Sequence, residues 1–270
     1  RHGQWPWPRD RVADLVSRIA SGRPAVIGVD VFFPEPDRYS PQAVATRLEA
    51  RVPEIAARLR ELPSNDALLG EALAKAPAVL GVAGLEAKDA RFAGPPRSPP
   101  VRYLEGAGEE LRRYPGHLRN VPEIEKGAAG HGLISVDLEG GVVRRVPMAA
   151  RFDEATVPAL AVEMLRVALD APLTIAPAAG GTIELRFGEY AVPAQSDGKA
   201  YVRYGHSAPG KFVSAADLLD GTQDPAGLEG QLVLVGFTGL GLVDVVTTPL
   251  GETVFGVENH AQALEAILEG

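Results

Sequence analysis

The sequence predicts an α/β fold, with a mixed, mostly buried central sheet that is flanked by helices and accompanied by an antiparallel hairpin section. Three observations predict this class. Nearly continuous apolar runs at 25–33, 79–82 and 232–237 are typical of strands buried on both faces. Helical periodicity lies beside these runs towards both ends of the chain. Between them, a Glu-Gly-Gly turn at 139–141 separates two short apolar segments, which indicates a hairpin.

The N-terminal part predicts one helix and the first strand. Pro8 suits the first turn of a helix over 9–20, because the missing N–H of proline costs nothing there. The apolar positions of this helix recur at helical spacing: Val12, Leu15, Val16 and Ile19. We expect the strand at 25–33 and the last strand, at 232–237, to be neighbours at the centre of the sheet.

The next part of the chain predicts two more helices and an irregular segment. We expect helices at 41–61 and 65–76, with Ser64 or Asn65 as the N-cap of the second. Residues 86–125 are rich in proline, glycine and charge, so we expect an irregular excursion there.

The C-terminal half predicts the hairpin and two helices. The strands of the hairpin are expected at 134–136 and 142–148, and a small antiparallel section is expected within 182–205. Amphipathic patterns predict helices at 157–169 and 256–268. The apolar stripe expected on the last helix consists of Val257, Ala261, Leu264 and Leu268.

The composition excludes several classes of function. A formal net charge of −8 argues against nucleic acid, which needs a basic face. Without cysteine, the chain forms no disulfide and has no thiolate nucleophile. We expect no catalytic residue, because no nucleophile–base–acid pattern is recognisable. We expect no metal site, because the histidines lack metal-binding spacing, and no cofactor, because Gly236, Gly239 and Gly241 do not have the order and spacing of the dinucleotide-binding motif. The length is compatible with a single domain over 1–270.

We expect the sequence to be one domain of a longer polypeptide. It starts at Arg1 without methionine and stops at Gly270, just past an apolar helix. No segment approaches the roughly 20 apolar residues of a membrane span. Any span of the parent protein is therefore expected outside these residues.

Acidic residues crowd the end of the first strand. Asp30, Glu35 and Asp37 follow its apolar run, and Asp244 follows the last strand at a comparable place. Ligands gather at the carboxyl ends of strands in α/β sheets, and oxygen ligands suit a hard cation. The structural alternative is that Asp30 caps a helix or pairs with an arginine, while the other two are turn residues.

Four further candidates lie elsewhere in the chain. Arg144 and Arg145 point to opposite faces if they lie in a strand, so one of them could reach a carboxylate of a ligand or a structural acid such as Asp30. Glu258 and His260 lie on the last helix, where His260 either packs beside the apolar stripe or contacts a ligand.

Four stretches, taken in order, carry a resemblance to a known family. They are WPWPR at 5–9, IGVDVFFPEPD at 27–37, GVVRRVP at 141–147, and the run 230–264, which includes GLVD at 241–244 and GVENHA at 256–261. Their order and spacing resemble the type-two CHASE domain, a sensory extracellular domain associated with cyclases and histidine kinases.

The resemblance implies an extracytoplasmic sensor domain of a membrane-bound signalling protein, with transmembrane helices on both sides of it in the parent. The output expected in the cytoplasm is an adenylate or guanylate cyclase, a histidine kinase, a diguanylate cyclase or a serine/threonine kinase. A small ligand or an ion would be sensed, and the signal would pass through the C-terminal helix. The alternative is a ligand-independent dimerisation scaffold of the same receptor. A homodimer is expected, and a nucleic-acid partner is not.

Overall fold

The computed structural model describes residues 2–89, 91–92, 94–238 and 244–270. The predicted α/β class is confirmed: helices surround a central sheet whose strands run in the order β13, β1, β2, β4, with β5 also pairing with β2. The strands are β1 (Val26–Val29), β2 (Ala78–Leu85), β4 (Gly116–Leu118), β5 (Gly130–Leu133) and β13 (Leu232–Val235). β13, β1, β2 and β5 are parallel, and β4 runs antiparallel to the second half of β2.

The first and last long apolar runs pair as predicted. Val26 lies opposite Leu232 and Val29 lies opposite Val235. In the described part of the chain β13 has β1 as its neighbour on one side only, so it lies at the edge of the sheet. The expectation that both strands lie at the centre is therefore wrong for β13.

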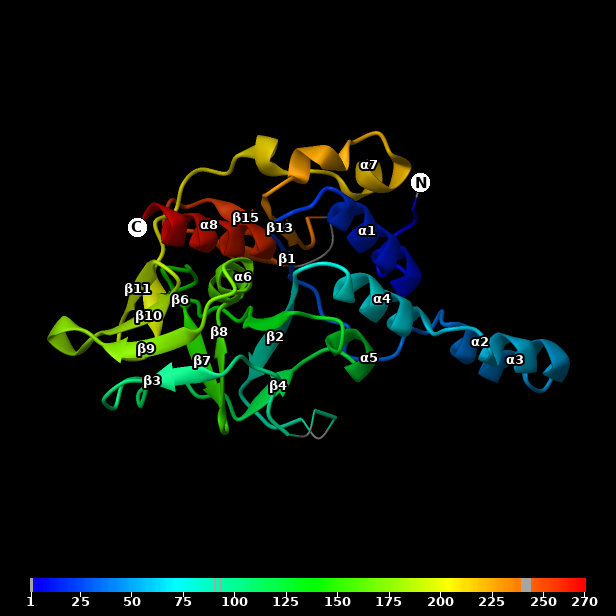
Figure 1. Cartoon of the computed structure of the whole chain (residues 1–270), viewed down its shortest axis with the longest axis horizontal. Helices are drawn as coiled ribbons and strands as arrows, with labels where there is room; N and C mark the ends of the chain where they lie inside the picture. Colours follow the sequence, from blue (N-terminus) through cyan, green and yellow to red (C-terminus); the bar gives the residue numbers. More distant parts are fainter. Residues whose placement is uncertain (1, 90, 93, 239–243) are drawn as a thin grey trace.

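Helices cover both faces of this sheet, because the side chains of a strand alternate between its two faces. On one face, Ile27 and Val29 pack against α1 (Arg9–Ser21) and α4 (Asn65–Ala74). On the other face, Val26 packs with residues of α6 (Leu160–Ala168) and α8 (Gly256–Glu269). Figure 1 shows the two helix pairs on opposite sides of the strands.

Gly28 shows why this sheet is so closely covered. A Cβ added to Gly28 would lie 2.3 Å from the Sδ of Met164 on α6. It would also lie 2.8 Å from Cδ2 of Leu234, so both side chains would have to move, whereas glycine lets α6 approach the strand without such a shift.

The helix expected over 41–61 is two helices, α2 (Pro41–Leu48) and α3 (Pro53–Arg60). Val52 precedes Pro53 and has a non-helical backbone (φ −145°, ψ 69°), because proline disfavours helical geometry in the residue before it. Figure 1 shows this helical pair projecting away from the rest of the molecule. The predicted N-cap of α4 is confirmed at Ser64, whose side chain accepts a hydrogen bond from the N–H of Ala67.

The second sheet has the strand order β11, β10, β9, β3. Its strands are β3 (Val101–Tyr103), β9 (Leu173–Pro177), β10 (Ile183–Phe187) and β11 (Tyr190–Ala194). Three two-stranded sheets complete the fold: β6 (Arg145–Pro147) with β12 (Lys199–Tyr201), β7 (Ala149–Phe152) with β8 (Ala155–Pro158), and β14 (Val245–Thr247) with β15 (Thr253–Phe255). The remaining helical segments are α5 (Pro122–Glu125), α7 (Ala215–Asp220) and the 3₁₀ turns Ala179–Gly181, Pro209–Lys211 and Pro225–Leu228.

Three further expectations need correction. Residues 86–125 are not irregular throughout, because β3, β4 and α5 form within them. The helix expected at 157–169 begins only at Leu160, because the preceding residues pair as β8 with β7. Gly140 and Gly141 do form a turn with positive φ, but only an isolated bridge, Glu139 with Val142, closes it, so no hairpin forms at 134–148.

The strand expected at 134–136 lies earlier, as β5. Ile134 adds one further hydrogen bond to the ladder, from its N–H to the carbonyl of Val82. Beyond this point the hydroxyl oxygen of Ser135 accepts from the N–H of Gly84, so a side chain replaces the backbone partner and the strand ends. Among the described residues, no helix is long and apolar enough to cross a bilayer.

Candidate functional site

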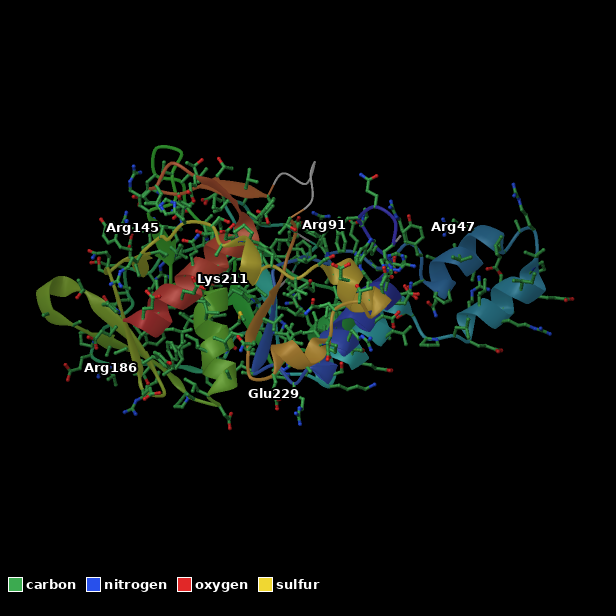
Figure 2. The ribbon with its side chains drawn as sticks, turned by 90° about the horizontal axis from the view of Figure 1, so that it is seen from above. Arg47, Arg91, Arg145, Arg186, Lys211 and Glu229 are labelled. Carbon is green, nitrogen blue, oxygen red and sulfur yellow. The ribbon has the colours of Figure 1, made fainter. Side chains whose placement is uncertain are left out.

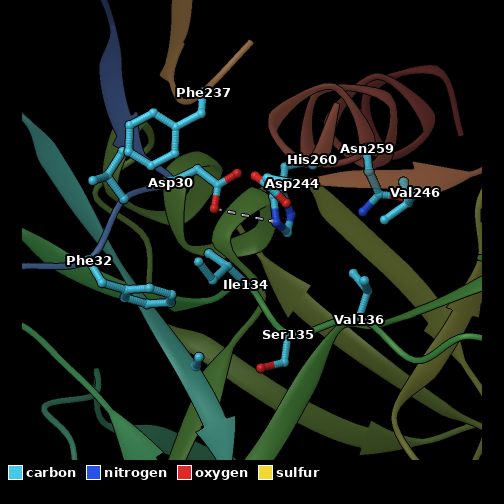
Figure 3. Close-up of a pocket in the computed structure, with 13 residues that line it drawn as sticks. Asp30, Phe32, Ile134, Ser135, Val136, Phe237, Asp244, Val246, Asn259 and His260 are labelled. Carbon is cyan, nitrogen blue, oxygen red and sulfur yellow. Dashed lines mark ion pairs between the residues drawn. The ribbon is translucent and has the colours of Figure 1, made fainter. Parts of the chain in front are cut away.

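A cavity of about 330 Å³ opens at the carboxyl ends of β1 and β13. Asp30 directly follows β1, and its N–H donates to the carbonyl of Val235, which holds it at this edge of the sheet. Figure 3 shows Asp30, Asp244 and His260 pointing toward one another in the cavity. The residues that line it are Asp30, Val31, Phe32, Ala83, Ile134, Ser135, Val136, Phe237, Asp244, Val246, Gly256, Asn259 and His260.

Asp30 and His260 form the buried centre of the site. The Nε2 atom of His260 lies 3.9 Å from Oδ1 of Asp30, and each side chain is only 5% exposed. The other carboxylate oxygen of Asp30, Oδ2, is buried without a hydrogen-bond partner among the described residues. A buried oxygen without a hydrogen-bond donor lowers the stability of the folded protein, so a ligand that donates a hydrogen bond to it would be favoured.

Asp244 enters the cavity from the segment that precedes β14. Its carbonyl accepts a hydrogen bond of 3.0 Å from the N–H of Gly256, at the start of α8. A Cβ added to Gly256 would lie 2.3 Å from Oδ1 of Asp244, so the absence of a side chain at this position makes room for the carboxylate.

Burial changes the protonation of all three groups. It raises the pKa of Asp30 to about 7, with a smaller contribution from the negative charge of Asp244. It lowers the pKa of His260 to about 4, although Asp244 and a backbone hydrogen bond at Ile134 oppose this effect. It also raises the pKa of Asp244, which His260 partly offsets. At neutral pH the imidazole is therefore neutral, and Asp30 titrates.

The first turns of α8 supply one wall of the cavity. Gly256, Asn259 and His260 are three and four residues apart, so they share a face of the helix. The hydroxyl group of Tyr204 donates to Oδ1 of Asn259 at 2.7 Å, and the N–H of Gly205 donates to the side chain of Gln262 at 2.9 Å. These bonds tie the same helix to the segment that follows β12.

The rest of the lining is mostly apolar. Phe32 and Phe237 lie on one side of the acidic centre, and Val136 and Val246 lie toward the other. Among the described residues that line the cavity, none is lysine or arginine. The cavity therefore combines apolar walls with two carboxyl groups and no permanent positive charge.

Two of the expected acidic candidates lie away from this cavity. Asp37 is buried, and its carboxylate accepts hydrogen bonds from the N–H groups of Arg9 and Tyr39 and from the side-chain amide of Asn65. It thereby joins the N-terminal ends of α1 and α4. Glu35 is exposed, and its carboxylate lies 3.3 Å from Arg91.

The predicted arginine partners of Asp30 also lie elsewhere. Arg145 pairs with Glu139 at 2.6 Å and with Asp197 at 3.6 Å, and a guanidinium N–H of Arg144 donates to the carbonyl of Glu139. Figure 2 shows Arg145 far from Arg47, near the other end of the molecule from α2 and α3. The hypothesis that Arg144 or Arg145 neutralises Asp30 is therefore wrong, because both guanidinium groups contact Glu139, in the turn that follows β5.

The other candidate residues have local roles. Glu258 is buried in the first turn of α8, beside the residues that line the cavity. Trp5 packs against Phe33 and Phe237, the second with ring centroids 4.5 Å apart, so it lies under the first helix and next to the cavity wall. Residues 239–243, which include the first three residues of the GLVD motif, lie outside the described residues.

Sequence reasoning missed Asn259 and the apolar walls. A signal for Asn259 was present: it is a polar residue directly before His260 in the last helix, where Glu258 and Gln262 are buried as well. Phe32, Phe237 and Val246 gave no such signal, because apolar residues beside strands usually belong to the core.

Fold and cavity together define the class. This is an α/β domain with a small, acid-containing cavity at the carboxyl ends of parallel strands, where open α/β sheets bind ligands. Comparison with known protein families matches the CHASE2 domain over residues 1–270, so the chain belongs to the CHASE2 family, whose members are sensory extracellular domains of signalling proteins. No curated protein and no solved structure matches the chain.

Proposed function

We propose that this domain is the extracytoplasmic sensor of a membrane-bound signalling protein and that α8 relays the state of the cavity to transmembrane spans. A single observation carries the proposal. α8 supplies Gly256, Asn259 and His260 to the cavity wall and continues to Glu269, at the C-terminal end of the domain. One rigid element therefore connects the candidate site with the end from which a signal would leave.

The packing of α8 supports a relay. It lies against α6, β13, β14 and β15, and β14 contributes Val246 to the lining of the cavity. A ligand shifts a conformational equilibrium only if it contacts the two states differently. A ligand held between Asp30 on the sheet and His260 on the helix meets this condition, because its contacts depend on how α8 sits against β1.

The output of the parent protein is a cyclase or a kinase on this proposal. The support is the family: CHASE2 domains belong to signalling proteins. The sensor itself acts by binding, because its cavity offers acids and a neutral imidazole next to apolar walls.

The absence of cysteine makes the relay directly testable. Spin labels on cysteines introduced at Glu71 of α4 and Leu268 of α8, both exposed, report the position of α8 by pulsed electron resonance. Val136→Trp fills the cavity and stands in for an occupied site. We expect it to shift the distance distribution, whereas Val213→Trp, at an exposed position away from the cavity, leaves it unchanged. Identical distributions in both variants would refute the relay.

The alternative, a ligand-independent dimerisation scaffold, predicts a different result. A scaffold responds to protein concentration and not to the cavity. Sedimentation equilibrium and thermal unfolding at several protein concentrations, for the Val136→Trp variant and the unsubstituted chain, separate the two hypotheses. Both hypotheses allow the melting temperature to depend on protein concentration, but only a sensor also changes its self-association when the cavity is filled.

A further inference from the structure

We propose that the cavity binds a small organic cation, with an ammonium group held between Asp30 and Asp244 and an apolar body against Phe32 and Phe237. The inference rests on the proposed sensor function and names the class of ligand for the same cavity. The ligand class follows from the charge of the cavity, from its unmet hydrogen bonding and from its shape.

The charge of the cavity favours a cation. Asp30 faces Asp244, from the segment before β14, and His260, from α8. Because burial keeps His260 neutral, the described lining holds two acids and no positive partner. Two carboxylates in a buried site repel each other unless one is protonated or a cation lies between them. A bound ammonium ion supplies that cation.

Unmet hydrogen bonding points the same way. Oδ2 of Asp30 is buried and lacks a donor among the described residues. An ammonium group has three N–H donors and no acceptor, so it can satisfy Asp30 and Asp244 at once. A carboxylate or phosphate ligand would instead add negative charge to a cavity that already holds two acids.

The shape of the cavity selects an organic cation over a metal ion. Calcium needs six to eight oxygen ligands and magnesium needs octahedral coordination. In the described part of the chain no group of three or more acidic or histidine side chains is arranged to hold a metal. The walls are instead apolar and aromatic, and the faces of Phe32 and Phe237 can attract a cation as well as cover its alkyl body.

Size limits the ligand to a small molecule. The volume of about 330 Å³ lies at the lower end of the range for small-molecule sites, roughly 300–1,000 Å³. Primary monoamines with four to eight carbons, such as butylamine, isoamylamine and phenethylamine, suit this space.

The protonation of Asp30 gives the proposal a distinctive signature. With its pKa near 7, Asp30 must lose a proton before its carboxylate can accept an ammonium group. At pH 7, binding therefore releases roughly half a proton from Asp30, and below about pH 6 the affinity falls towards tenfold per pH unit.

Titration calorimetry with these three amines tests the proposal, with butanol, isoamyl alcohol and 2-phenylethanol as neutral controls. At pH 8 we expect at least one amine to bind at least tenfold more tightly than its alcohol. Measurements at pH 7 in two buffers with different ionisation enthalpies should show the release of protons. Asp30→Asn and Asp244→Asn should each weaken amine binding at least tenfold, whereas Asp14→Asn, on the exposed face of α1, should leave it unchanged.

Several outcomes would overturn the proposal. They are equal binding of amines and alcohols, no binding of any amine, undiminished binding to Asp30→Asn, and stoichiometric binding of Mg²⁺ or Ca²⁺ at the same residues. The failure of the relay is a separate result. If amines bind but do not move the spin labels on α8, the ligand class stands and the relay fails. If no amine binds but Val136→Trp moves the labels, the relay stands and the ligand class fails.

Discussion

His260 and Asp30 face each other at 3.9 Å with reversed proton affinities. In water an imidazole binds a proton more tightly than a carboxylate, but burial raises the pKa of Asp30 to about 7 and lowers that of His260 to about 4. Between these values the folded protein therefore carries the proton on the carboxyl group. The unfolded chain carries it on the imidazole.

Asp30→Asn should reveal the histidine half of this exchange. In the unsubstituted protein between pH 4 and 6.5, the folded state holds one proton on Asp30 and the unfolded state holds one on His260, so the two effects on stability cancel. Without Asp30, only the unfolded state binds that proton. The free energy of unfolding should then rise by about 3 kcal/mol, relative to the unsubstituted protein, as the pH increases across this window.

The same variant should be the more stable protein at pH 8. There the unsubstituted protein must bury an ionised Asp30, which costs about 1.4 kcal/mol for each pH unit between its folded and unfolded pKa values. Urea unfolding at pH 5 and pH 8 measures both effects. A variant less stable than the unsubstituted protein at pH 8 would show that Asp30 is stabilised by a partner.

His260→Gln should reveal the carboxyl half. Only the folded state then holds a proton above pH 4, on Asp30, so stability should fall as the pH rises from 4 to 7. The decline levels off above pH 7, where Asp30 is ionised in both states. If the stability of this variant instead followed pH in parallel with that of the unsubstituted protein in urea unfolding, the pKa of His260 would not be lowered in the folded state, and the exchange of proton affinities would be refuted.

Asp37→Ala should destabilise the fold without affecting the cavity. The substitution leaves the N–H groups of Arg9 and Tyr39 and the amide of Asn65 without their acceptor. We expect a loss of about 3 kcal/mol, because buried donors without partners are costly. The exposed Glu35→Ala is the matched control and should change stability by less than about 0.5 kcal/mol. Chemical unfolding at pH 7 compares them, and equal effects would contradict the structural role of Asp37.

Gly256→Ala should disturb the cavity at its junction with α8. The new Cβ would collide with the carboxylate of Asp244, so that side chain must move. We expect amine affinity to fall at least tenfold, while circular dichroism still shows a folded protein. Gly227→Ala is the control, because nothing lies within 4 Å of its added Cβ. Unchanged amine affinity in Gly256→Ala would argue against a role of Asp244 in binding.

Part of the site could be predicted because it follows from strand direction. The apolar runs that became β1 and β13 are uniform, as buried parallel strands require, so Asp30 and Asp244 were expected near one another. The identity of their neighbour could not be predicted in this way. It depends on how α8 is rotated about its own axis. Because buried residues lie on most sides of this helix, the apolar pattern in the sequence does not determine which side faces the two aspartates. Leu268, expected to be buried, is exposed, and Gln262 is buried.

Pairing β1 with β13 brings together residues from nearly opposite ends of the sequence. Contacts of such long sequence separation form slowly, because a long loop must close before they gain any stability. During synthesis β1 must wait for almost the whole domain before its neighbour emerges. The cavity lies at the carboxyl ends of these two strands, so it forms only after they have paired, late in folding. A substitution that weakens the pairing of β1 with β13 should therefore lower the yield of folded protein.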